Sequence, residues 1–203
     1  MSSMISRHPH DATLMSFAAG SLPEPLAASV SAHVSMCARC HDEMRDMELI
    51  GTELLRELPA TSVCERKMEV PNRPTEAPSP GGRLPGSGRI ADRLPPPIAR
   101  KYGLASDGIP WRAWKRYGTG FWYHRLALSP GVKGDLRLVK VAPGCKMPRH
   151  GHGGAELTLV LEGAYADESG EFRRGDMQDV DEETEHEPVA DKELGCICLF
   201  GTD

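Results

Sequence analysis

The sequence predicts a two-domain α+β protein, in which a small helical unit precedes a small β-barrel or sandwich. Three observations predict this fold class. Apolar residues recur at helical spacing up to about residue 58, proline and glycine dominate the stretch that ends near residue 97, and short apolar or alternating runs follow. We therefore expect a helical domain over residues 1–65, a linker over 66–97 and a β-rich domain over 98–203.

Composition narrows the class of protein. A chain of 203 residues suits two small domains, and a net charge of −5 gives no basic surface for direct binding of nucleic acid. The first residues, MSSMISRHPH, lack the apolar core of a signal peptide, and no apolar run reaches the length of a membrane span. We expect a cytoplasmic protein whose six cysteines are reduced, and these are then metal ligands or reactive thiols before disulfides.

Three helices are predicted in the first domain. Asp11 is a good N-cap for the first helix, which carries Leu14 and stops at Gly20. The second is expected from about Pro23 to about Cys37, and the third from about Arg39. The apolar side of the third helix is formed by Met44, Met47, Leu54, Leu55 and Leu58.

The motif His33-x₃-Cys37-x₂-Cys40 predicts a zinc site in these helices. His33 and Cys37 share a helix face at this spacing, and Cys40 follows at the helix end or in the next turn. They supply three tetrahedral ligands, and either His8 or His10 is a candidate for the fourth. A closed four-ligand site of this kind would hold a small helical bundle together. The alternative interpretation is a redox CxxC pair or two buried cysteines.

In the second domain the runs FWYHRLAL, DLRLVKVAP, ELTLVLEGAY and CICLF are predicted strands between glycine-rich turns. Cys196 and Cys198 lie two apart on the last strand, so both are expected to face the barrel interior. Beside a metal, two thiols are candidates for oxidation in a signalling step. The simpler interpretation is that they are two small buried core residues.

A second metal site is predicted in the stretch GCKMPRHGHGGAELTLVLEG, from Gly144 to Gly163. His150 and His152 point the same way on a strand, and Glu156 can return to that face after a Gly-Gly turn. His186 can complete the set from a later strand. Neutral imidazoles and a carboxylate suit Zn²⁺, Fe²⁺, Mn²⁺ or Ni²⁺. The alternative interpretation is a group of surface histidines in a loop.

The spacing of these residues closely resembles the first cupin motif, and FRRGDMQDVDEETEHEP resembles the second. The resemblance covers about residues 98–203 and implies a double-stranded β-helix. It also implies four metal ligands, which are His150, His152, Glu156 and His186. We expect zinc first, with iron, manganese and nickel as alternatives.

The motif HxxxCxxC in a short helical domain is similar to that of the zinc-binding anti-sigma family. Joined to a cupin, it resembles the ChrR-type anti-sigma factors, and the match extends to HPHDATLMSFAAGSL and CICLFGTD. Aligning on Asp11 favours His8 over His10 as the fourth zinc ligand. The resemblance implies an extracytoplasmic-function (ECF) sigma factor as partner, relief of inhibition by singlet oxygen or organic peroxide, and no enzymatic activity. It also allows a homodimer through the cupin domain.

Two other functions compete with this interpretation. Three histidines and a glutamate with open coordination positions also suit a cupin metalloenzyme such as a dioxygenase. Alternatively, the pair Cys37 and Cys40 acts as the thiol switch of a redox-regulated binding module. The N-terminal zinc motif favours the regulator, because an enzyme has no evident need of it.

Overall fold

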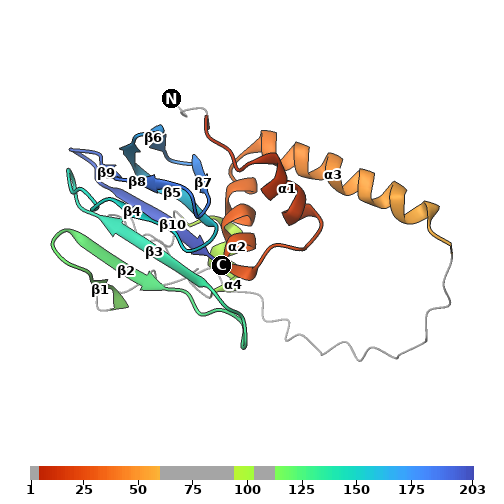
Figure 1. Ribbon diagram of the computed structural model, residues 1–203, viewed down its shortest axis with the longest axis horizontal. Coiled ribbons are helices and arrows are strands. Elements are labelled where there is room, and N and C mark those ends of the chain that lie inside the picture. Colours follow the sequence, from red (N-terminus) through yellow and green to blue (C-terminus); the bar gives the residue numbers. More distant parts are fainter. Residues whose placement is uncertain (1–4, 60–93, 103–112) are drawn as a thin grey trace, which may run out of the picture.

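The computed structural model describes residues 5–59, 94–102 and 113–203 (Figure 1). The predicted linker up to residue 93 lies outside these ranges, as does Cys64. In the described part of the chain, no helix is both long and apolar enough to cross a membrane. The helices there are α1 (Asp11–Ala18), α2 (Glu24–Val34), α3 (Ala38–Glu57) and α4 (Pro96–Lys101). The strands are β1 (Lys115–Arg116), β2 (Phe121–Arg125), β3 (Asp135–Val141), β4 (His150–Gly151), β5 (Glu156–Asp167), β6 (Gly170–Arg173), β7 (Met177–Val180), β8 (Glu185–His186), β9 (Val189–Ala190) and β10 (Cys196–Thr202).

The three predicted N-terminal helices are confirmed, with small differences at their ends. Asp11 is not the N-cap of α1; His10 occupies that position and Asp11 is the first helical residue. A carboxylate there still interacts favourably with the positive end of the helix dipole. Gly20 follows α1 with a φ of 68°, a left-handed conformation that ends the helix. The second helix ends at Val34 rather than at Cys37, so Cys37 becomes the N-cap of α3.

The C-terminal part is an antiparallel β-sandwich, and each of the four predicted runs contains a strand. The large sheet has the order β1-β2-β3-β10-β5-β6, and both β7 and β9 also pair with β5. A separate two-stranded sheet pairs β4 with β8. This small sheet matters most for the site, because its register sets His150 opposite His186.

Both faces of the central strands are buried, but against different partners. On β3, Leu136 and Leu138 are fully buried in a core that also contains Val30 of α2 and Ile98 of α4. The other face of the sheet points into the barrel. There a smaller cluster contains Val141, Val160, Tyr165, Phe172, Ala190, Cys196 and Cys198. The larger of the two cores is therefore shared between the helices and the sheet.

Helix α2 lies directly against β5 and β10, as Figure 1 shows. The approach is closest at Gly201, where an added Cβ would come within 2.6 Å of the Pro25 carbonyl oxygen and 2.7 Å of the Ser29 hydroxyl. The predicted linker implies two separate units, and this contact is the main departure from that prediction. Each leucine buried in the shared core contributes about 1.5–3 kcal/mol. Parting the two units would consume much of the ~5–15 kcal/mol that stabilises a typical protein.

The C-terminal end of the predicted linker is also structured. Leu94 is buried, and α4 begins at Pro96, within the range 66–97. Because Ile98 and Ala99 of α4 pack into the shared core, the chain enters the barrel already anchored against α2.

Candidate metal centres

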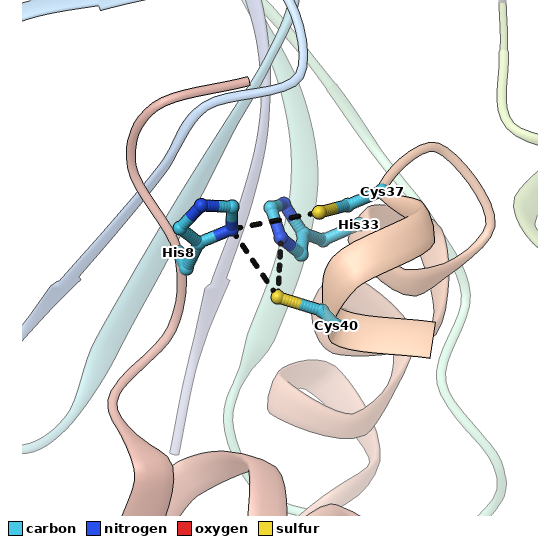
Figure 2. Close-up of side chains that lie close together, drawn as sticks. All are labelled: His8, His33, Cys37 and Cys40. Carbon is cyan, nitrogen blue, oxygen red and sulfur yellow. Dashed lines mark hydrogen bonds between the residues drawn. The ribbon is translucent and has the colours of Figure 1, made fainter. Parts of the chain in front are cut away.

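His8, His33, Cys37 and Cys40 come together at one point (Figure 2). The arm before α1 supplies His8, the last turn of α2 supplies His33, and the start of α3 supplies both cysteines. The Cys40 sulfur lies 3.3 Å from His33 Nε2 and 3.3 Å from His8 Nδ1, and the Cys37 sulfur lies 3.5 Å from His8 Nδ1. Zn–S and Zn–N bonds of about 2.3 and 2.0 Å in a tetrahedron give S···N separations of about 3.5 Å.

Of the two candidates for the fourth ligand, the structure brings His8 into the cluster. The side chain of His10 is 73% exposed, and its backbone N–H donates to Asp179 on the barrel. In the arm before α1, the His8 side chain therefore points into the cluster and the His10 side chain points to solvent. This agrees with the choice that alignment on Asp11 favoured.

Burial favours the uncharged forms of this cluster. It lowers the pKa of His33 to about 4, so its imidazole is neutral at physiological pH and can ligate a metal. Burial, followed by the neighbouring Cys37, raises the pKa of Cys40 to about 12. If both buried sulfurs are to ligate as thiolates, a cation must compensate their charge. Two sulfur and two imidazole donors in a closed tetrahedron fit structural zinc.

The barrel holds the back of this cluster in place. The Nδ1–H of His33 donates to the carbonyl of Gly175 at 2.9 Å, which fixes the tautomer and leaves Nε2 free for a metal. The neighbouring Asp176 carboxylate is buried and accepts from the backbone N–H groups of Ser6 and Arg7, at 2.7 and 3.0 Å. The turn between β6 and β7 thus positions both the His33 ring and the arm that carries His8. The sequence marked Asp176 only as part of a motif.

His150, His152 and His186 form the second cluster. His150 on β4 and His186 on β8 are opposite each other, and their Nε2 atoms lie 3.2 Å apart. The Nδ1–H of His150 donates to the Pro148 carbonyl, and that of His186 donates to the Asp167 carboxylate, at 2.9 and 3.0 Å. In their neutral forms both rings would then present an Nε2 lone pair toward the same point, which fits two ligands of one metal ion.

Glu156 lies beside this cluster but behind His152. Its carboxylate accepts from the Nδ1–H of His152 at 2.6 Å, and it is not among the three residues whose ligand atoms converge. This hydrogen bond raises the pKa of His152. The Nε2 of His152 is buried and has no hydrogen-bond partner among the described residues. Such an orphaned nitrogen fits a metal ligand, with Glu156 orienting the ring.

Asp167 is a functional residue that sequence reasoning missed. Its side chain is fully buried, and it accepts from His186 and from Gln178 Nε2, the latter at 2.6 Å. Burial would raise the pKa of Asp167, but these hydrogen bonds and those of Ser169 hold it well below its usual value. It therefore stays a carboxylate that orients His186. No local motif marks Asp167, because two of its partners lie on later strands, Gln178 on β7 and His186 on β8.

A cavity of about 400 Å³ lies next to the three histidines, inside the barrel. His150, Glu156 and His186 line it, and so do Cys196 and Cys198, as expected from their shared strand face. Both thiols are buried. A hydrogen bond with Cys196, together with burial, raises the pKa of Cys198 well above its usual value, so this thiol stays protonated at neutral pH.

Known proteins are similar to this chain over nearly its whole length. Residues 101–203 match the family model of the ChrR cupin-like domain. The chain is 35% identical over 98% of its length to the anti-sigma-E factor ChrR of Cereibacter sphaeroides, and the alignment covers 90% of that protein. The chain belongs to the ChrR family. This confirms the expected family and the fold class of N-terminal helices followed by a cupin.

A solved structure resembles this ChrR-family chain along nearly all its length. The crystal structure of SigE from Rhodobacter sphaeroides in complex with the anti-sigma factor ChrR gives a TM-score of 0.77 at 30% identity, covering 98% of this chain and 100% of that chain. KdgF from Halomonas sp. is also similar, but at 24% identity and a TM-score of 0.38, over 44% of this chain and 86% of that chain. The relative from Cereibacter sphaeroides, which aligns with nearly the whole chain, is an anti-sigma factor.

Proposed function

We propose that this chain is a zinc-dependent anti-sigma factor that binds an ECF sigma factor in the cytoplasm and inhibits it without contacting DNA. Family membership supports this proposal, and so does the similarity to a ChrR bound to SigE. In the proposal zinc at His8, His33, Cys37 and Cys40 organises residues 1–65 as the sigma-binding unit. Residues 66–97 connect it to the cupin of residues 98–203, which could also form a homodimer.

The observation that carries the proposal is an exposed apolar surface on α3. The second half of this helix extends away from the rest of the protein in Figure 1. The large apolar side chains there and at the C-cap are 60–68% exposed, and these are Leu49, Ile50, Leu54, Leu55 and Leu58. Met44 and Met47, nearer the zinc cluster, instead pack against the shared core. An amphipathic helix that leaves its apolar residues in water is typical of a partner-binding surface.

Placing negative charges on the exposed apolar surface of α3 tests sigma binding. The double variant Leu54→Glu, Leu55→Glu should weaken binding of the ECF sigma factor at least 100-fold in the full-length protein, while the melting temperature stays the same because both side chains are exposed. Leu194→Glu is a matched control, because Leu194 is 74% exposed on the barrel. Equal sigma affinity in the double variant and the control would overturn the proposal.

We further propose that the barrel relieves this inhibition when singlet oxygen or organic peroxide acts on it. The contacts between the two metal clusters support this part. Asp167, which holds His186, also accepts from the backbone N–H of Ser169 at 2.8 Å, and the Ser169 carbonyl accepts from the Arg7 guanidinium at 2.9 Å. Arg7 immediately precedes His8. A displacement of His186 could therefore reach a zinc ligand through three consecutive contacts.

A second set of contacts joins the barrel interior to the same arm. The Arg7 guanidinium lies over the Phe172 ring, 5.4 Å from its centroid, and Phe172 stacks on Tyr165 at 4.9 Å. Tyr165 lines the cavity and donates to Gln178, which donates to Asp167. Both sets of contacts therefore connect the barrel to the N-terminal arm through Arg7.

The variant Arg7→Met tests this route. In the preformed sigma complex, organic peroxide or singlet oxygen should release the wild-type sigma factor, and release from Arg7→Met should be at least fivefold slower at unchanged affinity before treatment. Arg173→Met is the control, because that arginine is exposed and its side chain pairs with Glu171. Wild-type release from Arg7→Met would exclude the arm as the route. No release from the wild type would end the sensing proposal and leave sigma binding intact.

Two further points belong to this proposal. Zinc is the metal we propose for the barrel, with iron, manganese and nickel as alternatives that metal analysis of the purified protein would decide. Cys196 and Cys198 remain candidate redox residues. If the double variant Cys196→Ala, Cys198→Ala still releases the sigma factor at the wild-type rate, the signal acts at the metal or its ligands instead.

A further inference from the structure

The strand register divides the barrel cavity into a polar and an apolar end. One row of paired residues across the sheet consists of Arg125, Arg137, Phe200, Thr158 and Gln178. All five line the cavity. Glu156 also lines the cavity and starts β5 two residues before Thr158, so this row lies at the end that holds the metal cluster.

The next two rows are mostly apolar. Tyr123 pairs with Val139, which pairs with Cys198, and these three line the cavity. Beyond them, Phe121 pairs with Val141, which pairs with Cys196. A molecule in this cavity would therefore meet guanidinium groups and the metal cluster at one end and an apolar wall at the other.

The charges at the polar end do not cancel. Arg137 and Arg125 share one carboxylate, that of Asp135, which leaves a net positive charge on the three groups. The nearby Glu156 is held by His152. The Arg137 guanidinium also lies over the rings of Tyr123 and Phe200, at 5.6 and 5.4 Å from their centroids, which holds it in place.

Arg137 also carries an unused donor. Its Nε is buried, and it has no hydrogen-bond partner in the described parts of the chain. Burial lowers the pKa of this guanidinium, because removal from water disfavours its charged form. A buried N–H without an acceptor is rare in proteins, and a guanidinium fork matches the paired oxygens of a carboxylate.

We propose that the barrel cavity binds a small organic acid, with its carboxylate on Arg137 and its apolar body against Tyr123, Val139 and Cys198. This inference goes beyond the anti-sigma function and holds whether or not a sigma factor is bound. A cavity of about 400 Å³ is in the size range of small-molecule sites. Two residues that line the cavity are mostly exposed, with exposed fractions of 76% for Tyr117 and 67% for the Arg125 side chain, so the cavity is open to solvent.

Calorimetric titration of the full-length, metal-loaded protein with octanoate and with 1-octanol tests the proposal. Octanoate should bind at least tenfold more tightly than the alcohol, since both have the same apolar chain. Arg137→Met should reduce this preference to twofold or less while the affinity for 1-octanol stays the same. Arg173→Met, an exposed arginine outside the cavity, should keep the full preference. Equal binding of acid and alcohol by the wild type, or binding of neither, would overturn the proposal.

Two further variants serve as controls for this experiment. If Arg137→Met does not fold, Arg137→Lys can replace it, because it keeps the positive charge but lacks the guanidinium group. In this variant the logarithm of the octanoate-to-octanol affinity ratio should fall by at least half. If the preference persists in Arg137→Met but disappears in His150→Ala, the carboxylate binds the metal and the assignment to Arg137 is wrong. Sigma affinity of Arg137→Met without octanoate should equal that of the wild type, so failure of this inference is distinct from failure of the proposed function.

Discussion

The two donor clusters differ in what surrounds them. In the N-terminal cluster two sulfurs and two imidazoles close on one point, and His33, Cys37 and Cys40 are all buried. In the barrel cluster three imidazoles converge, and two of them line a cavity of about 400 Å³. A closed tetrahedral set is typical of structural metal, whereas three ligands beside a cavity leave coordination positions for another molecule. The contrast fits the proposal that the first cluster holds the fold and the second is open to another molecule.

The two clusters are alike in one respect, which is that oxygen acceptors fix their imidazoles from behind. The Gly175 carbonyl holds His33, and the carboxylates of Asp167 and Glu156 hold His186 and His152. Because Gly175 belongs to the barrel, the N-terminal cluster depends on a contact from the C-terminal half of the protein. Variants of each cluster would test this dependence and the contrast between the clusters.

The largest effect is expected from Cys40→Ser. Structural zinc in small domains contributes about 10–16 kcal/mol of apparent binding free energy, and a buried ligand lost from a set of four should remove most of it. The protein should lose one zinc equivalent by metal analysis and its sigma binding, and its free energy of unfolding should fall by at least ~3 kcal/mol. Cys145→Ser is the control, because Cys145 is partly exposed and outside both metal clusters. An unchanged zinc content would contradict the structural role.

A somewhat smaller effect is expected from Asp176→Asn. This buried carboxylate accepts from the backbone of Ser6, Arg7 and Arg173, and hydrogen bonds to charged groups contribute about 1.5–3 kcal/mol each. We expect about 2–4 kcal/mol of destabilisation, faster amide exchange at Ser6 and Arg7, and N-terminal zinc affinity about 10- to 100-fold weaker.

Asp191→Asn is the matched control for that experiment. Asp191 also accepts from backbone N–H groups, those of Glu193 and Leu194, but these lie in a barrel turn away from the arm. If amide exchange at Ser6 and Arg7 rises equally in both variants, the effect is a general loss of barrel stability, and the dependence of the zinc cluster on Asp176 fails.

Glu156→Gln should act on the barrel metal alone. If the carboxylate orients His152, the barrel should keep its metal with affinity about 10- to 100-fold weaker, while the N-terminal zinc is unchanged. His150→Ala, which removes a converging ligand, should empty the barrel in the same metal competition assay. Complete loss of barrel metal in Glu156→Gln would instead make Glu156 a direct ligand, as the cupin motif implies.

The smallest effect concerns the reactivity of the barrel thiols. The hydrogen bond with Cys196 and burial raise the pKa of Cys198, so the reactive thiolate is scarce at pH 7 and grows only as pH rises toward that raised pKa. In the folded protein at pH 8, iodoacetamide should modify the partly exposed Cys145 at least tenfold faster than Cys198. Mass spectrometry of peptides measures both rates. Equal rates would show that Cys198 is accessible as a thiolate.

Much of the fold and of both clusters could be predicted because the signals are local. His33, Cys37 and Cys40 lie within two turns of chain, and His150, His152 and Glu156 lie on either side of one glycine turn. His33 and Cys37 do not share one helix face as predicted, because α2 ends at Val34 and the turn to α3 brings the two side chains together. In the barrel, strand geometry alone decides which side chains share a face. The same holds for Cys196 and Cys198, whose alternation on β10 places both in the barrel interior.

The residues that reasoning missed make contacts across long stretches of sequence. Asp176 binds Ser6 and Arg7 near the other end of the chain, and Asp167 meets His186 only after the turns from β6 to β8 are in place. A signal for the shared core was present in α2. Its small residues Ala28, Ser29 and Ala32 are buried together with larger ones, as expected of a helix enclosed between two layers.

By itself, the sequence determined the three N-terminal helices, the main strands and most candidate members of the two donor sets, because periodicity and short spacing act through local backbone geometry. Only the tertiary structure decided that α2 packs on the sheet and that a barrel turn holds the His33 ring. It likewise decided that Arg137 faces a cavity. An apolar face or a polar side chain specifies that it needs a partner, but which distant segment supplies that partner depends on how the whole chain packs.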